Sequence, residues 1–267
     1  MSPPPFGQVR RLGVVGSTNA YLLGEARRGA PAGLVAVADH QTAGRGRLGR
    51  RWEAPPGSSL LLSVLLRPVL PAGDLHLCTA AVALATASAC RTVAGVWPTV
   101  KWPNDLLVGD DKLAGVLAEA DAAAPGGPPG SVAVVVGVGC NVDWPGPPDA
   151  GGTCLADAAG RPVDREPLLQ ALLTELGPRV EALGTDDGRR GLGDELRARC
   201  RTLGQVVRVD LVGAAEGGAG TGDGIVGRAV DLTAEGHLVV ETGDGRQVVA
   251  AGDVVHLRPA DGDRRGR

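Results

Sequence analysis

One alanine-rich segment, LHLCTAAVALATASACRTVAG at 75–95, limits most strongly what this sequence can fold into. It closes on Gly95, a residue that commonly ends helices, so the segment predicts one long buried helix. Two apolar runs, at 58–68 and 131–143, are rich in leucine and valine and are typical of buried strands. Together these three segments predict a core that combines helix and sheet.

The other segments up to about residue 200 extend this mixed pattern. Ser17 and Thr18 precede a helical stretch and are good N-terminal caps for it. In KWPNDLLVGDDKLAGVLAEA, the turn-forming residues at 109–111 separate two apolar runs, as expected for a hairpin. The elements expected here are strands at 10–16, 34–44, 104–108 and 112–120, and helices at 19–28, 165–183 and 190–203.

From Gln205 onward the sequence changes to five short β-rich runs separated by turns that contain glycine and aspartate. This pattern predicts a small antiparallel barrel of about sixty residues. A glycine-rich stretch at 213–224 is expected to form a long mobile loop within it. The prediction is an α+β protein, with a mixed sheet and helices in 1–203 and a small β domain in 204–267.

Composition limits the class of protein further. The 267 residues carry a net charge of −3, which argues against a protein whose main partner is the nucleic-acid backbone. The start, MSPPPFGQVRR, has no apolar run of signal-peptide length, and we expect no membrane-spanning segment. The cysteines form no C-x-x-C pair and are expected to be structural thiols of a cytoplasmic protein. They are Cys78, Cys90, Cys140, Cys154 and Cys200.

Lysine and asparagine are rare in this chain, and they concentrate in a few segments. Of the 27 lysine and arginine residues only two are lysines, Lys101 and Lys112, and both lie in KWPNDLLVGDDKLAG. The three asparagines are Asn19, Asn104 and Asn141, in GSTNA, KWPND and VGVGCNV. A surface charge can be lysine or arginine, whereas a site that needs a compact, rotatable ammonium cannot make that exchange. These segments are therefore the candidates for a functional site.

The segment GRGRLGRRW at 44–52 combines three glycines with four arginines. Glycine lets backbone N–H groups turn toward an anion, and arginine adds bidentate donors, so the loop suits a phosphate or a carboxylate. A solvated basic loop or a nucleic-acid contact remains an alternative on this pattern alone. We expect the loop to be mobile when no ligand is bound.

Three other segments place polar side chains at strand ends. GSTNA lies at a strand-to-helix junction, where ordinary helix capping is the alternative to ligand binding. In KWPNDLL, Pro103 forces an extended backbone before Asn104 and Asp105, and Asn141 follows a buried strand. Each segment has a structural alternative, a turn or a strand end. Together, around one basic loop, they predict a single nucleotide-sized cleft.

These motifs carry a family resemblance. GSTN, HQTAGRGRLGRRW, KWPNDLLVGDDKLAGVLAE and VGVGCNV occur in the order and approximate spacing of biotin–protein ligases, also called biotin–[acetyl-CoA-carboxylase] ligases. The ending AGDVVHLR resembles the small C-terminal SH3-like domain of that family. The resemblance implies a class II synthetase-like catalytic domain in 1–203 and the SH3-like domain in 204–267. Leu48, Cys140 and Cys154 depart mildly from the family pattern and remove no polar group that the chemistry needs.

The reaction that the resemblance implies has two steps. The biotin carboxylate attacks the α-phosphorus of ATP with Mg²⁺ assistance, giving biotinyl-5′-adenylate and pyrophosphate. A lysine of a carboxylase carrier domain then attacks the mixed anhydride and releases AMP. The catalytic residues implied are Lys112, Arg45 and Arg47, because two anions brought together need a cationic cradle.

The resemblance also assigns the rest of the site. The biotin-binding residues implied are Ser17, Thr18, Asn19, Gln41, Gly44, Arg45, Gly46, Arg47, Lys112 and Gly115. The residues implied for ATP and the adenylate are Arg47, Arg50, Trp52, Asn104, Lys112 and Asn141, with Trp52 packed on the adenine. Asp105 is a candidate magnesium contact. Lys101 is either a phosphate contact or an ion-pair partner.

The partners implied are biotin, ATP and a biotin carboxyl carrier domain, without DNA or membrane, and the assembly implied is a monomer or weak homodimer. Some relatives carry an N-terminal helix-turn-helix domain, for which the roughly ten residues before the first expected strand are too few. Three alternatives stay open: a lipoate–protein ligase, a nucleic-acid-binding module, and a ligand-binding relative without catalysis. A lipoate ligase should carry a different basic motif, and the chain lacks the aromatic platforms of a nucleic-acid module.

Overall fold

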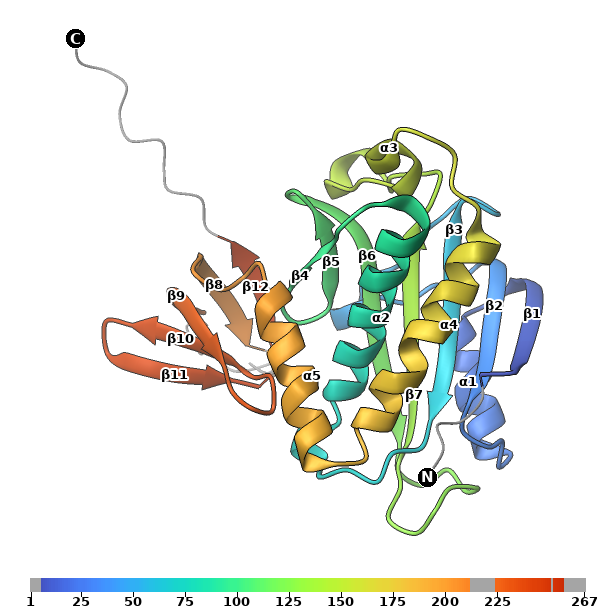
Figure 1. Ribbon diagram of the computed structural model, residues 1–267, viewed down its shortest axis with the longest axis horizontal. Coiled ribbons are helices and arrows are strands. Elements are labelled where there is room, and N and C mark those ends of the chain that lie inside the picture. Colours follow the sequence, from blue (N-terminus) through green and yellow to red (C-terminus); the bar gives the residue numbers. More distant parts are fainter. Residues whose placement is uncertain (1–5, 212–223, 251, 257–267) are drawn as a thin grey trace.

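The structure is a computed structural model that describes residues 6–211, 224–250 and 252–256. Its main body is a mixed seven-stranded sheet with the order β1-β2-β3-β7-β6-β5-β4 (Figure 1). β1 and β2 run parallel, and the other neighbouring strands run antiparallel. The strands are β1 (Gln8–Val15), β2 (Leu34–Gln41), β3 (Ser59–Leu66), β4 (Thr99–Lys101), β5 (Asp105–Val108), β6 (Asp111–Asp121) and β7 (Ala133–Asn141).

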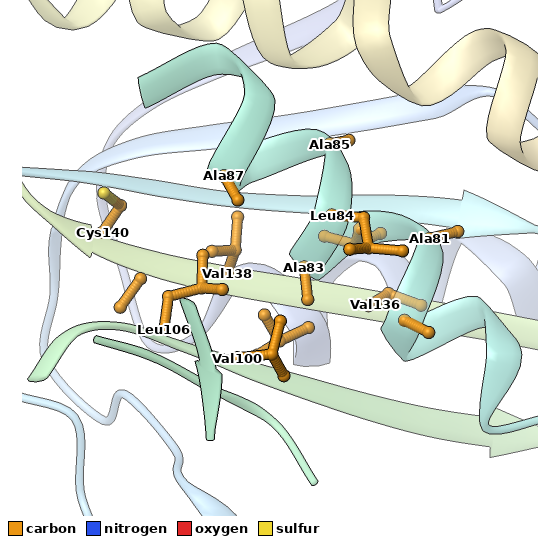
Figure 2. Close-up of a cluster of buried hydrophobic side chains, with 14 of the residues drawn as sticks. Ala81, Ala83, Leu84, Ala85, Ala87, Val100, Leu106, Val136, Val138 and Cys140 are labelled. Carbon is orange, nitrogen blue, oxygen red and sulfur yellow. The ribbon is translucent and has the colours of Figure 1, made fainter. Parts of the chain in front are cut away.

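Different helices cover the two faces of this sheet. The helices are α1 (Thr18–Arg27), α2 (Leu77–Ala94), α3 (Leu155–Ala159), α4 (Arg165–Ala182) and α5 (Asp186–Arg199). Alternate residues of a strand point to opposite faces. On β7, Val136 and Val138 belong to the core with α2 (Figure 2), whereas Val135 packs in a separate cluster with α1. The sheet is therefore enclosed by α1 on one side and by α2 and its neighbours on the other.

Local sequence signals set where several helices begin and end. Ser17 caps α1, its hydroxyl oxygen accepting the N–H of Ala20 at 3.4 Å. Gly95 follows α2 with φ of 72°, the left-handed conformation that favours glycine. α5 begins at Asp186, earlier than expected, because Thr185 Oγ1 accepts the N–H of Gly188 at 3.1 Å.

One stretch of the described residues, which includes the core helix α2, resembles a membrane span in length and composition. By length and composition alone, the stretch Ala72–Ala94 is apolar enough to cross a membrane. In the described structure, 78% of its apolar window is buried inside the protein. Figure 2 shows Ala83 and Leu84 packed among side chains of the sheet. The stretch therefore has the surroundings of a core helix.

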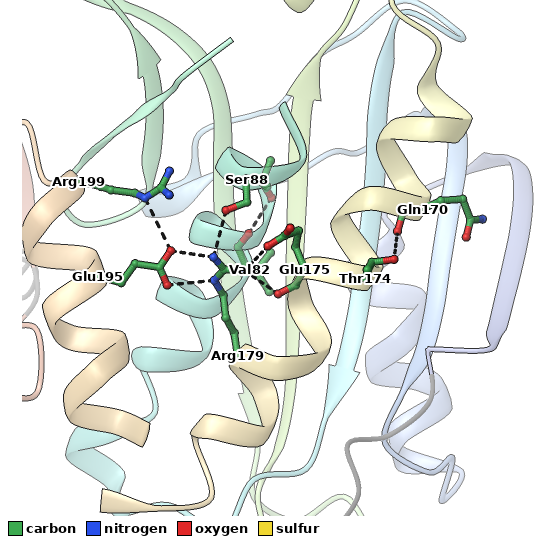
Figure 3. A network of polar contacts seen from close by, with 9 residues as sticks. Val82, Ser88, Gln170, Thr174, Glu175, Arg179, Glu195 and Arg199 are labelled. Carbon is green, nitrogen blue, oxygen red and sulfur yellow. Dashed lines mark hydrogen bonds and ion pairs between the residues drawn. The ribbon is translucent and has the colours of Figure 1, made fainter. Parts of the chain in front are cut away.

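Polar contacts join α2, α4 and α5 to one another. Arg179 of α4 lies 2.8 Å from Glu175 Oε2 and 2.7 Å from Glu195 Oε1, and it donates to Ser88 Oγ at 3.1 Å (Figure 3). The Arg179 side chain is only 15% exposed, and an unpaired charge at such a position would be costly. The network thus orients three helices around one guanidinium.

The β-rich runs after residue 205 form a second sheet, which is antiparallel and has the order β11-β10-β9-β8-β12. Trp102 connects it to the main body: its indole N–H donates to Gly236 O at 3.0 Å, and its backbone N–H donates to Thr202 Oγ1 at 3.0 Å. The glycine-rich loop expected at 213–224 lies outside the described residues, apart from Gly224. The strands are β8 (Val206–Leu211), β9 (Ile225–Leu232), β10 (Leu238–Thr242), β11 (Gly245–Val249) and β12 (Gly252–His256).

Two short elements, β4 and α3, were not expected from the sequence. β4 has three residues and α3 has five, which is too short for an apolar period to show. The strands and helices that were expected are all present, and their ends differ from the expected ones by a few residues.

Leu84 tests the assignment of α2 to the core, since its side chain is fully buried. We expect Leu84→Ala to lower the free energy of unfolding by about 2–5 kcal/mol, because the surrounding atoms cannot fully close the cavity. Denaturant unfolding measures this change. The control is Val69→Ala, at a side chain that is 59% exposed, where the change should stay within about 0.5 kcal/mol. Equal effects of the two substitutions would contradict the assignment.

Candidate active site

The main cavity lies on the face of the sheet that α1 covers. Its volume is about 870 Å³, and its floor includes Gly137 and Gly139 of β7, which alternate with core residues such as Val138. Gly44 lines an adjoining cavity of about 470 Å³. The predicted residues that line the main cavity are Ser17, Thr18, Asn19, Gln41, Arg45, Gly46, Arg47, Arg50, Trp52, Asn104, Asp105, Lys112, Gly115 and Asn141.

The loop at 44–52 folds back on itself beside this cavity. Arg45 and Arg51 form an isolated antiparallel bridge, and the N–H of Gly46 donates to the carbonyl of Arg50 at 2.7 Å. Position 44 requires glycine, because a Cβ there would lie 2.3 Å from a backbone oxygen of the loop. The expected mobility of the loop without ligand stays a prediction.

Two of the three expected catalytic cations meet oxygen acceptors from β5 and the residue before it. Lys112 Nζ lies 2.7 Å from Asp105 Oδ1. Arg47 Nη1 donates to Asn104 Oδ1 at 3.2 Å. The Asn104 amide is fixed in that orientation because its nitrogen donates to the carbonyl of Val116 at 2.9 Å. Positive groups from the loop and from β6 are therefore gathered on one wall of the cavity.

A β-bulge turns Lys112 toward this wall. Strict alternation along β6 would place residue 112 on the same face as Val116, which is buried in the core. The pairing of β5 with β6 shifts register between Leu106 and Leu107, so Lys112 pairs with Leu107 on the cavity side. Leu113, which alternation would turn to the cavity, is fully buried in the core. The bulge thus supplies the site with its ammonium group.

Another part of the cavity carries hydroxyl and amide groups from α1 and β2, and a buried hydroxyl of β3 supports them. Gln41 Oε1 accepts the backbone N–H of Thr18 at 2.7 Å and lies 3.1 Å from Thr18 Oγ1. Ser63, which is fully buried on β3, lies 2.7 Å from Thr18 Oγ1 and 2.6 Å from Asn19 Oδ1. These short contacts hold the polar groups in fixed orientations, as recognition of a polar ligand requires.

Trp52 lies over the glycine floor of the cavity. A Cβ on Gly139 would lie 2.4 Å from the indole, and a Cβ on Gly115 would lie 3.1 Å from it. The ammonium of Lys112 lies 5.7 Å from the ring centre, within the range of cation–π attraction. Glycine at these two positions therefore lets the indole reach the floor beside Lys112. The expected packing of Trp52 on adenine stays a prediction.

Asn141 organises the loop that follows β7. Its amide nitrogen donates to the carbonyls of Pro145 at 3.1 Å and Thr153 at 3.0 Å. The same loop is tied to the backbone of Lys112, whose N–H donates to Gly151 O at 3.0 Å. Asn141 thus shapes the cavity rim through its N–H groups, and its expected adenylate contact stays a prediction.

Sequence reasoning missed two residues that support the site, Glu119 and Ser63. Glu119 Oε1 lies 3.0 Å from Arg45 Nη1, and Glu119 Oε2 accepts from Asn19 Nδ2 at 2.8 Å. Each had a signal in the sequence: Glu119 follows Gly115 at an even spacing along a strand, and Ser63 interrupts the apolar run 58–68.

Arg201 and Gln205 also line the cavity, and no sequence pattern pointed to either residue. Arg201 Nη2 donates to Asp110 Oδ1 at 2.5 Å, and its backbone N–H donates to the carbonyl of Val100 at 2.8 Å. The segment between α5 and β8 therefore forms part of the rim near Lys101, which lines the same cavity. Contacts between residues about 100 positions apart leave no local pattern.

The described residues contain no group of three or more His, Cys, Asp or Glu side chains arranged to hold a metal ion. Asp105, the expected magnesium contact, has its Oδ1 beside Lys112. A single carboxylate suits a Mg²⁺ ion that is carried mainly by substrate phosphates and water.

The cysteines do not supply a nucleophile. All five are unbridged and buried in the structure. Burial raises the pKa of the Cys78 thiol to about 12 and also raises the pKa of Cys200. Thiols of this kind are inert at neutral pH, because the thiolate is the reactive form.

Comparisons with known proteins decide the family. Residues 12–141 match the Biotin/lipoate A/B protein ligase family, and residues 219–257 match the Biotin protein ligase C terminal domain. The chain is 40% identical over 258 residues to the Biotin--[acetyl-CoA-carboxylase] ligase of Mycobacterium tuberculosis, an alignment covering 93% of this chain and 90% of the relative. This chain belongs to the biotin protein ligase family.

Other members of the biotin protein ligase family agree. The Biotin--[acetyl-CoA-carboxylase] ligase of Paracoccus denitrificans is 34% identical over 251 residues, covering 89% of this chain and 96% of the relative. The structure of the "Biotin protein ligase from Aquifex aeolicus in complex with biotin and ATP" matches with a TM-score of 0.77 at 24% identity, covering 95% of this chain and 100% of that chain. The α+β fold with a small C-terminal SH3-like β domain is confirmed.

Proposed function

We propose that this chain is an ATP-dependent biotin–protein ligase, an enzyme that activates biotin to biotinyl-5′-AMP and transfers it to a lysine of a carrier domain. The observation that carries the proposal is the convergence of Arg45, Arg47 and Lys112 on one cavity that also holds a fixed network of amides and hydroxyls. The ligase names of the relatives in Mycobacterium tuberculosis and Paracoccus denitrificans support it.

The three cations suit the first chemical step. A carboxylate must approach an α-phosphate, and two unit charges about 4 Å apart repel by about 4 kcal/mol at an effective dielectric constant of 20. Arg45 and Arg47 would hold the two anions with directed N–H groups, and Lys112 would place a point charge between them. Because these groups are already positioned, little reorganisation is needed as charge develops.

The hydroxyl and amide network suits the bicyclic head of biotin, whose ureido group offers N–H donors and a carbonyl. Ser17, Thr18, Asn19 and Gln41 all line the cavity near the N-terminal end of α1. Gly137 on the floor leaves the room that Asn19 occupies, since a Cβ there would lie 2.2 Å from Asn19 Oδ1, and Gly115 lines the same cavity. In this proposal Trp52, Asn104 and Asn141 serve the nucleotide end, together with Arg50.

Magnesium is part of the proposal as a substrate-borne ion. Asp105 would be its protein contact, and the ion would offset phosphate charge while Lys112 holds the reacting oxygens. The Lys112–Asp105 pair is compatible with this assignment, since Asp105 has a second oxygen that the ion pair does not use.

The remaining assignments are proposals of the same kind. The acceptor is a biotin carboxyl carrier domain of an acetyl-CoA carboxylase or a related biotin enzyme, and the protein works in the cytoplasm as a monomer or weak homodimer. The net charge of −3 supports a role that involves no DNA. Residues 1–203 would form the catalytic domain, and 204–267 would form the SH3-like domain.

The test is incubation of the protein with ATP, Mg²⁺, a carrier domain and either biotin or lipoate, followed by intact-mass measurement of the carrier. We expect one biotinyl group per carrier with biotin, and no change with lipoate or without ATP. A carrier whose acceptor lysine is replaced by arginine is the control. A lipoyl adduct would favour the lipoate alternative, and an unmodified carrier under every condition would contradict ligase function.

A further inference from the structure

We propose that Glu119 is a positioning residue that sets the two halves of the biotin site at once, the amide of Asn19 and the guanidinium of Arg45. The inference rests on the proposed function and adds to it a residue that touches both groups. Glu119 Oε2 accepts from Asn19 Nδ2 at 2.8 Å, and Glu119 Oε1 lies 3.0 Å from Arg45 Nη1. One carboxylate therefore links a group for the ligand's head to a group for its reacting carboxyl.

Glu119 fixes the orientation of the Asn19 side-chain amide. The two N–H groups of the Asn19 amide are used by Leu117 O, at 3.1 Å, and by Glu119 Oε2. The amide oxygen lies 2.6 Å from the hydroxyl of Ser63, which donates to it. A flipped amide would turn its oxygen toward a carbonyl and a carboxylate, both of which only accept hydrogen bonds. The negative charge of Glu119 thus fixes the amide in one orientation.

This orientation selects the chemistry that Asn19 can offer. Its hydrogens are both engaged within the protein, so the remaining lone pair of Oδ1 is what a ligand can use. Asn19 is then an acceptor for a ligand N–H, such as that of a cyclic urea, and cannot serve as a donor to a ligand carbonyl. Glu119 therefore acts on ligand specificity through Asn19.

The contact with Arg45 couples this recognition to the reactive end of the site. The Glu119 side chain is 25% exposed and the Arg45 side chain is 43% exposed, so the guanidinium is anchored by one nitrogen while much of it stays accessible. Arg45 also lies in the isolated bridge with Arg51, which limits where its backbone can move. A ligand carboxylate can then approach the other N–H groups of a guanidinium that is already in place.

The first test is Glu119→Gln, which keeps the size of the side chain but leaves one acceptor oxygen for two donors. We expect the Kd for biotin, measured by calorimetry without ATP, to rise about tenfold or more, since a hydrogen bond to a charged group is replaced by a mismatch. The turnover number for adenylate formation should fall as well, because Arg45 loses its anchor.

The matched control is Asp121→Asn, two residues along β6 on the same face. Asp121 lies 2.8 Å from Arg27 Nε, outside the main cavity, so this variant removes the same charge from the same strand. Its Kd for biotin should stay within about twofold of wild type. Equal weakening in both variants would overturn the proposal, as would a Glu119→Gln variant that binds biotin with wild-type affinity.

Two combinations separate positioning from a merely structural role. In an Asn19→Ala background, Glu119→Gln should weaken biotin binding less than it does in the wild-type background, because only the contact with Arg45 is then left to lose. The reversed pair, Asn19→Asp with Glu119→Gln, should bind biotin more tightly than Asn19→Asp alone, since donor and acceptor again match. The proposal would be contradicted if the losses of biotin affinity in Asn19→Ala and Glu119→Gln were additive. It would also be contradicted if the reversed pair bound biotin no more tightly than Asn19→Asp.

Failure of the inference is distinct from failure of the proposed function. If the wild-type protein neither binds nor activates biotin, the function itself is wrong. If the wild type forms the adenylate and Glu119→Gln behaves like it, only the role of Glu119 is wrong. Thermal unfolding of each variant is compared with wild type. Should Glu119→Gln fail to fold, the affinity of the reversed pair relative to Asn19→Asp still decides the matter.

Discussion

Lys112→Ala is expected to lower the rate of biotin adenylate formation by about 10³-fold while the protein remains folded. The ammonium lies where a carboxylate and a phosphate would meet, and preorganised donors at developing charge account for factors of about 10²–10³ each. Its loss also leaves the Asp105 carboxylate, now 2.7 Å from Nζ, without that counter-charge beside two further anions. In Lys112→Ala, the reacting carboxylate and phosphate would lose the attraction of the ammonium and would be repelled by the Asp105 carboxylate.

The fold should survive this substitution, because residue 112 holds its place through the backbone. Its N–H donates to Gly151 O at 3.0 Å, and its carbonyl accepts from the N–H of Thr153 at 3.0 Å. Lys112→Arg should also be strongly impaired, since a planar guanidinium cannot occupy the position of a compact ammonium between Asp105 and Trp52.

Pyrophosphate release under single-turnover conditions measures the step directly, and circular dichroism with a thermal melt verifies the fold. Arg27→Ala is the control, because it removes one positive charge from a side chain that is 66% exposed and lies outside the main cavity. Adenylate formation at the wild-type rate in Lys112→Ala would refute the assigned role of the lysine.

Gly137→Ala is expected to weaken biotin binding by about 100-fold. A Cβ at this position would lie 2.2 Å from Asn19 Oδ1 and 3.1 Å from Ser63 Oγ. The strand cannot move away easily, because residue 137 pairs with β3 through Ser63 and with β6 through Leu117. The added methyl group must therefore displace Asn19 from the orientation that the ligand needs, at a cost in the range of about 1–3 kcal/mol.

Calorimetric titration with biotin gives the Kd for this comparison. The matched control is Gly13→Ala, which makes the same change in a strand, β1, where a Cβ would meet nothing within 4 Å. Its affinity for biotin should equal that of wild type. Wild-type affinity in Gly137→Ala would show that the space above this glycine is not part of the biotin site.

Much of the fold follows from local patterns. The buried helix α2 was predicted from its alanine-rich composition and Gly95, and α1 was predicted from its Ser17 cap. The five strands of the second sheet were predicted from alternating apolar runs and turn residues. These predictions succeeded because caps, periods and turns depend on residues only a few positions apart.

The site could be predicted as a set of segments, but its internal contacts could not. Strand ends and the basic loop pointed to one cleft, and the predicted site residues other than Gly44 do line one cavity. The sequence could not predict which acceptor each cation contacts. In the structure, Lys112 pairs with Asp105, and Arg47 donates to Asn104. Such pairs depend on how separate segments are placed relative to one another.

The sequence by itself determined the elements, the family resemblance and the chemistry available, because residue types and short spacings are local properties. The tertiary structure alone decided the orientation of those groups. The bulge opposite Leu106 and Leu107 reverses the alternation that would bury Lys112, and Glu119 meets Asn19 from 100 positions away. Strand register and long-range contacts are set by packing of the whole sheet, so no local pattern specifies them.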